Sequence, residues 1–152
     1  MEYINILIHN KILVAGLIGW GTAQILKLII HLAVNKKLDF ERLIGDGGMP
    51  SGHSATVAAV ATSTAFQCGL DSPEFAIATI VAIIVMHDAK GVRLETGKQA
   101  VILNNMVEMF EKMSGQDLTP DEKLKEFVGH TPIQVYAGAL LGIIVAIIFH
   151  IL

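Results

Sequence analysis

The sequence predicts an all-α protein: a helical transmembrane bundle of about four spans with an amphipathic surface helix. Of its 152 residues, 53% are hydrophobic and only 16% are charged, whereas soluble domains average about 25% charged residues. The mean hydropathy is +0.58. Four mainly apolar stretches approach the roughly 20 residues that a helix needs to cross a bilayer. The length indicates one integral membrane domain, residues 1–152.

The first predicted span covers residues 12–34, and a short interfacial helix precedes it at about 3–9. The second, 54–70, is short and rich in Ala, Thr and Ser. Such a helix faces lipid poorly but suits the centre of a bundle, because small side chains let neighbouring helices approach closely.

The third predicted span, 72–89, contains the strongly apolar run FAIATIVAIIVM. The fourth, 131–152, contains GALLG, in which Gly138 and Gly142 form a small-xxx-small pair suited to helix contact. The sequence leaves open whether that contact also builds a homo-oligomer.

A polar segment, 90–130, separates the last two spans. Its apolar residues fall on one face of a helix that Gly115 ends: Ala100, Leu103, Val107, Phe110 and Met113. A capping box at Thr119, Pro120 and Glu122 predicts a second, short charged helix. The first helix fits a membrane surface and ordinary packing equally well.

Composition excludes several classes of function. The formal net charge is −3, and no basic-aromatic patch indicates nucleic-acid binding. A single cysteine, Cys68, allows no disulfide within the chain and no metal cluster, so we expect neither metal nor cofactor. We expect no cleavable signal peptide, because Glu2 is acidic and the first apolar stretch is long.

Basic residues concentrate in loops 35–50 and 90–130, which four spans place on the same side of the membrane. These loops hold nine of the eleven basic residues: Lys36, Lys37, Arg42, Lys90, Arg93, Lys98, Lys112, Lys123 and Lys125. The positive-inside rule then predicts a multi-pass protein of the cell membrane, with cytoplasmic loops and both termini outside.

The same topology gathers polar clusters at the cytoplasmic face. The clusters are Ser51, Gly52 and His53 before the second span, His87, Asp88 and Arg93 after the third, and Gly129 and His130 before the fourth. Three segments distant in sequence are therefore expected to share one membrane depth.

The first span adds Gln24, Lys27 and His31, which share one helical face. A lysine within a span either snorkels to the headgroups or points into the bundle. In the second case Lys27 would neutralise an anion, with Gln24 beside it.

Together these groups suit phosphate chemistry. Helix N-termini at Ser51 and Thr131 offer backbone N–H groups to an anion, and Gly52 lets the anion approach the backbone closely. Lys27 and Arg93 add positive charge. Two histidines could then serve as nucleophile and general acid in phosphoryl transfer.

The motif PSGH at 50–53 and the ending GHTPIQVYAGALLG at 129–142 resemble signatures of the type 2 phosphatidic acid phosphatase superfamily, which also includes vanadium haloperoxidases. GGMPSGHSA together with HDAKGVRLETGKQA is more similar to its divergent branch of small membrane proteins. The resemblance covers about residues 24–142 and implies His130 as nucleophile and His53 as general acid. It assigns phosphate binding to Lys27, Ser51 and Gly52.

The chain also departs from the superfamily pattern. No Arg-Pro pair follows Lys27, and Leu124 stands where the third signature has an arginine. Gln134 replaces the aspartate that normally orients the nucleophilic imidazole. Asp88 and Arg93 are candidates to supply the missing carboxylate and guanidinium, or they form a structural ion pair.

The resulting functional hypothesis is a lipid-phosphate phosphatase, independent of metal, that acts through phosphohistidine at the cytoplasmic interface. Its partners would be a phosphorylated lipid and the membrane. The alternative is a non-catalytic membrane protein that binds or transports a phospholipid or anion in the same pocket. A purely structural membrane partner is a third reading, which leaves the polar clusters unexplained.

Overall fold

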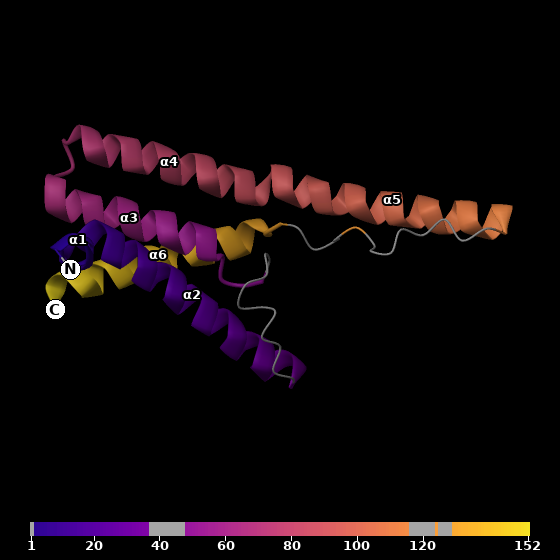
Figure 1. Ribbon diagram of the computed structural model, residues 1–152, viewed down its shortest axis with the longest axis horizontal. Coiled ribbons are helices and arrows are strands. Elements are labelled where there is room, and N and C mark those ends of the chain that lie inside the picture. The colour runs from indigo at the N-terminus through magenta and orange to yellow at the C-terminus, as the bar shows by residue number, and fades with distance from the viewer. Residues whose placement is uncertain (1, 37–47, 116–123, 125–128) are drawn as a thin grey trace.

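The computed structural model describes residues 2–36, 48–115, 124 and 129–152, without the side chains of residues 35, 92 and 93. Throughout these ranges the secondary structure is helical and no strand occurs, which confirms the all-α prediction. The helices, labelled in Figure 1, are α1 (Glu2–His9), α2 (Lys11–Asn35), α3 (Gly52–Cys68), α4 (Pro73–Lys90), α5 (Val92–Ser114) and α6 (Pro132–Ile151).

Helix α3 is the centre of the bundle and packs against α2, α4 and α6. Its small side chains allow this: Ala55 and Ala59 are completely buried, and so are Ser54 and Ser63. The predicted central position of this helix is therefore confirmed.

Three stretches are long and apolar enough to cross a membrane: Lys11–Val34, Pro73–Ser114 and Pro132–Ile151. Helix α3 is not among them, so the expected number of about four spans is met only approximately. Its 17 residues reach about 26 Å at 1.5 Å per residue, somewhat less than a bilayer core of about 30 Å. The other helices enclose α3, so its polar Ser and Thr residues need not face lipid.

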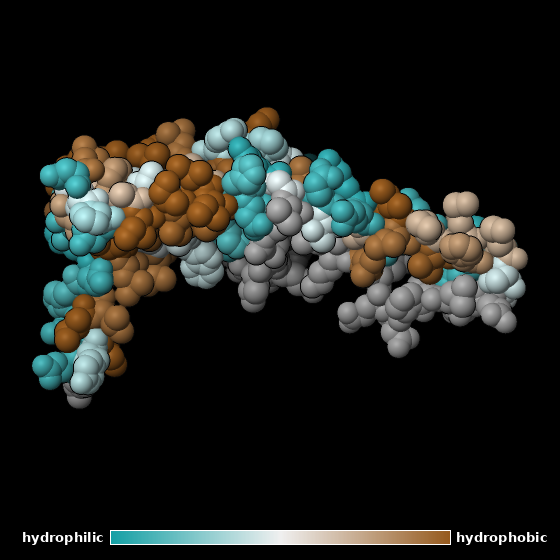
Figure 2. Space-filling view, turned by 90° about the horizontal axis from the view of Figure 1, so that it is seen from above, coloured by the Kyte–Doolittle hydropathy of each residue, from teal (hydrophilic) through white to brown (hydrophobic). Residues whose placement is uncertain are grey.

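Helix α4 turns an apolar face outward, with Ile77, Ile80 and Ile84 exposed. In Figure 2 this apolar surface gives way to a hydrophilic band where α4 meets α5. A surface that changes from apolar to polar along the helix axis is expected where a helix leaves the hydrocarbon region.

Three helices begin directly after a residue whose side chain accepts a backbone N–H of the first turn. Asn10 accepts from Leu13 at 3.1 Å, and Ser51 accepts from Ser54 at 3.4 Å. Ser72 caps α4 in the same way. These caps fix the helix starts, because they satisfy N–H groups that have no partner inside the helix.

The two ends of the bundle have different roles. Both chain termini lie at one end, where α3 finishes and α4 begins (Figure 1). There the Ser63 hydroxyl donates to the Lys11 carbonyl at 3.3 Å and lies 2.7 Å from Nε2 of His150. This network holds α2, α3 and α6 together, while the opposite end carries the polar clusters.

Helix α5 continues nearly along the line of α4 beyond Gly91 (Figure 1) and packs on no other described helix. It ends at Gly115, as expected, with φ +67°. The Asn104 side-chain amide pairs with the backbone of Leu124, at 3.0 and 3.2 Å. The second helix predicted from Thr119, Pro120 and Glu122 lies outside the described residues.

The GALLG pair of α6 allows that helix to touch the backbone of α3. A Cβ atom at Gly138 would collide with the carbonyl oxygen of Ser51, and one at Gly142 with that of Ala55. The motif is therefore used for a contact within the chain.

We expect Gly142→Ala to destabilise the protein by about 1–3 kcal/mol, because the added methyl group must displace the Ala55 carbonyl. Gly21→Ala on α2 is the matched control: a Cβ there meets nothing within 4 Å, and alanine favours a helix by up to about 1 kcal/mol. Thermal unfolding in detergent should show a lower Tm for Gly142→Ala alone. Equal Tm values for the two variants would contradict the close helix contact.

Candidate functional site

The turn that contains Ser51 is anchored to the start of α6. The Ser51 backbone N–H donates to the carbonyl oxygen of Gln134 at 3.0 Å. Gly48 enters the turn with φ +86°, a conformation that favours glycine. Ser51 itself is completely buried and caps α3, so the turn and the helix start form one unit.

The two histidines expected to act together do lie together. The rings of His53 and His130 are 6.0 Å apart between centroids and meet edge to face, at 82°. His53 is exposed, while His130 is only 2% exposed. The His130 backbone N–H donates to the Ala89 carbonyl at 3.1 Å. Three segments distant in sequence therefore meet at this end of the bundle.

Lys27 points into the bundle. Its side chain is 4% exposed and lies along Gly48, where a Cβ atom would stand 3.2 Å from both Cγ and Cδ of the lysine. Burial of this kind supports the inward orientation of Lys27 over snorkelling along a lipid-facing surface.

Gln24 faces the first turn of α3: its amide nitrogen would lie 3.5 Å from a Cβ atom at Gly52. The ring of Trp20 borders the same glycine, 3.7 Å from that Cβ position. The Gln24 Oε1 and the Ser54 Oγ are buried and have no hydrogen-bond partner among the described residues. Buried polar atoms are nearly always paired in proteins, so these atoms suit a site that receives a polar ligand or water.

Asp88 lies at the end of α4, half-buried, next to the residue whose carbonyl binds His130. His87 is exposed, and His31 on α2 is half-buried. Arg93 belongs to the first turn of α5, but its side chain lies outside the described part of the structure. The roles of Asp88 and Arg93 stay predictions.

Gln134 has a local structural role. Its Oε1 accepts the Thr131 backbone N–H at 2.9 Å and closes a capping box at the start of α6. The pattern Thr-x-x-Gln at 131–134 predicts this box. The resemblance to the superfamily instead interprets Gln134 as a replacement for an aspartate. No sequence pattern predicts that Trp20 and Ala89 border the site, because their positions depend on how the helices pack.

The arrangement suits an anion. The N–H groups of Gly52 and His53 and the positive dipole end of α3 lie next to the paired imidazoles, and the turn that leads into this helix contacts the buried Lys27. In the part of the chain that the structure describes, no three His, Cys, Asp or Glu residues are grouped as metal ligands.

Comparison with known proteins gives a consistent answer. Residues 8–145 match the family described as "Divergent PAP2 family". The chain is also 39% identical to a Bacillus subtilis (strain 168) protein titled "Uncharacterized membrane protein YuiD", and the similarity covers 93% of this chain and 95% of that protein. No solved structure matches the chain. The match spans most of the sequence, including both histidine segments, and the chain therefore belongs to the divergent PAP2 family of membrane proteins.

Proposed function

We propose that this protein hydrolyses the phosphate ester or pyrophosphate of a membrane lipid through a phosphohistidine intermediate. The observation that carries the proposal is the pair of imidazoles, 6.0 Å apart, at the N-terminus of α3. His130 is buried and His53 is exposed, which fits a nucleophile inside the bundle and a proton donor at its surface.

The phosphoryl oxygens are held by the groups around the start of α3. The N–H groups of Gly52 and His53 belong to the first helical turn, and such groups lack acceptors within the helix. The Ser51 hydroxyl and the Gln24 amide border the same turn. Lys27, buried beside Gly48, supplies positive charge where the low dielectric strengthens its attraction to phosphate.

The reaction then proceeds in two balanced steps. A ring nitrogen of His130 attacks the terminal phosphorus, and the bond from phosphorus to the leaving oxygen breaks as His53 donates a proton to that oxygen. A phosphate ester thereby releases the lipid alcohol, and a pyrophosphate releases the lipid monophosphate. Water next attacks the phosphohistidine and gives its proton to His53, so that inorganic phosphate is released and both histidines return to their starting forms.

One observation favours a second candidate, a non-catalytic protein that binds or transports a phospholipid or anion. Gln134 contacts the Thr131 backbone, so it is engaged in capping rather than in orienting an imidazole. A nucleophilic histidine usually needs a partner that fixes its tautomer and stabilises its positive form. Asp88 is the carboxylate closest in sequence to the segment that contacts His130, and it would have to fill that role.

We expect His130→Ala to abolish phosphate release from lipid phosphates in detergent with EDTA, because it removes the attacking nitrogen. His53→Ala should slow release by about 10²–10⁴-fold, the usual contribution of a general acid. Lys27→Met should weaken it as well, since the side chain keeps its bulk and loses its charge. Phosphate release is measured colorimetrically at matched protein concentrations.

His9→Gln is the matched control, because His9 is exposed on α1 at the other end of the bundle, where its Nδ1 lies 2.7 Å from the Asn5 carbonyl. Its activity should equal that of the unmodified protein. If His130→Ala retains full activity, His130 is not the nucleophile. Tight lipid binding with no turnover in the unmodified protein would select the binding protein instead.

We further propose that the site faces the cytoplasm and that both termini lie outside, on the basis of the basic loops. The native Cys68 is exposed at the end of the bundle that holds the termini, so it should react with a membrane-impermeant thiol reagent in intact cells. Ser114→Cys in a Cys68→Ala background should react only after permeabilisation. The reverse labelling pattern would invert the topology.

A further inference from the structure

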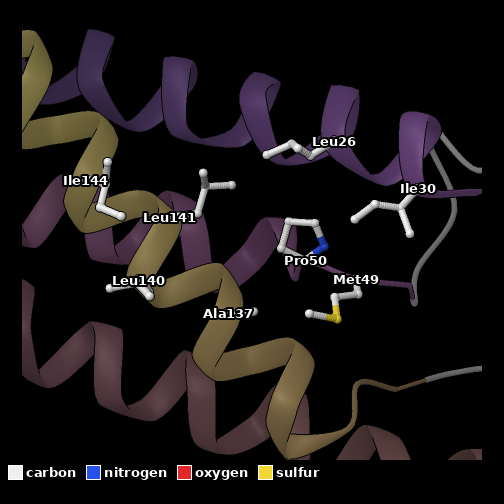
Figure 3. Close-up of a pocket in the computed structure, with 8 residues that line it drawn as sticks. All are labelled: Leu26, Ile30, Met49, Pro50, Ala137, Leu140, Leu141 and Ile144. Carbon is white, nitrogen blue, oxygen red and sulfur yellow. The ribbon is translucent and has the colours of Figure 1, made fainter.

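An apolar groove runs between α2 and α6 beside the candidate site (Figure 3). It has a volume of about 290 Å³, and every side chain that lines it is apolar. The groove includes Leu26 and Ile30 of α2, Met49 and Pro50 of the turn, and Ala137 and Leu141 of α6. Both bordering helices are long and apolar enough to cross a membrane, so we expect the groove to face hydrocarbon.

The groove begins where the phosphate-binding groups end. Leu26 directly precedes the buried Lys27, and Pro50 directly precedes the cap Ser51. Ala137 directly precedes Gly138, which touches the Ser51 carbonyl. Gly48 lies against the Lys27 side chain, and Met49 and Pro50, which follow it, line the groove. The same short turn therefore borders the groove and the buried lysine, so a molecule in the groove can present its anion to Lys27 and Ser51.

We infer that the groove binds one hydrocarbon chain of the substrate, and that the substrate is a phosphate or pyrophosphate of a long-chain alcohol rather than a glycerolipid. This inference rests on the proposed function of the site. The volume lies near the lower limit of small-molecule pockets, about 300 Å³, which accommodates one chain. The positive charge of Lys27, which lies against Gly48 in the turn that borders the groove, favours an anionic headgroup.

The apolar lining argues against a glycerolipid. A glycerolipid places ester carbonyls between its phosphate and its chains, and burying such groups without hydrogen bonds is unfavourable. None of the groove side chains can donate a hydrogen bond. An alkyl or isoprenyl chain attached directly to the phosphate oxygen meets apolar walls from its first carbons onward.

The test compares dodecyl phosphate with 1-dodecanoylglycerol 3-phosphate, which has the same chain length, and with glycerol phosphate, which has no chain. The kcat/KM for phosphate release should be highest for dodecyl phosphate. Ala137→Leu fills the groove and should raise the KM for dodecyl phosphate about tenfold, with little change in kcat or in the hydrolysis of glycerol phosphate. Ala76→Leu makes the same change on the exposed side of α4 and should alter nothing.

A binding measurement separates this inference from the proposed catalysis. Dodecyl phosphate with a diazirine near the chain end is irradiated with His130→Ala protein, and the adducts are mapped. They should fall on Leu26, Ile30 or Leu141, and dodecanol with the same diazirine should give about tenfold fewer. If adducts form in the groove but the unmodified protein shows no turnover, the proposed phosphatase activity is wrong and the groove assignment stands. Adducts elsewhere, or a preference for the glycerolipid, would overturn the groove assignment.

Discussion

The candidate site depends on the close approach of two helix backbones. Gly138 and Gly142 present no side chain to α3, so α6 lies against the carbonyl oxygens of Ser51 and Ala55. At this distance the Ser51 N–H reaches the Gln134 carbonyl, and the turn before α3 becomes part of the α6 surface. His130, just before α6, is thereby brought to His53 in the first turn of α3. A larger residue at either glycine would separate the two imidazoles.

The small residues of α3 serve both the fold and the site. They make the helix too polar and too short to be a good lipid-facing span, but they let α2, α4 and α6 enclose it. At the N-terminus of this central helix Ser51, Gly52 and Ser54 are buried, while His53 is exposed. Lys27, 4% exposed, adds a cation to that region, where fixed charges and dipoles act on a ligand more strongly than in water. The fold therefore places the positive groups before any ligand binds.

Much of this arrangement follows from the sequence, and the remainder depends on how the helices pack. Hydropathy and capping residues define the helices. The second and third predicted spans lie between Ser51 and Asp88, and no predicted span lies between Asp88 and His130, so the three residues are expected at one end. The inward orientation of Lys27 and the contact of Trp20 with Gly52 require the rotation of α2 about its axis, which hydropathy leaves undetermined. The capping role of Gln134 was encoded locally in Thr-x-x-Gln. The groove could not be predicted, since it is a gap between side chains of different helices.

The unequal exposure of the two histidines bears on how a substrate would reach the site. His130 is nearly inaccessible, whereas His53 is exposed, so in the proposed reaction a phosphate meets His53 before it reaches the His130 ring. In the proposed binding mode, a lipid whose chain lies between α2 and α6 is held near the turn that contains Ser51, and only its headgroup has to enter. A soluble phosphate ester lacks that apolar contact and must be bound by the polar groups alone. Binding energy from a non-reacting chain can position the headgroup for attack, and this is the physical reason for proposing a membrane lipid rather than a soluble ester as the substrate.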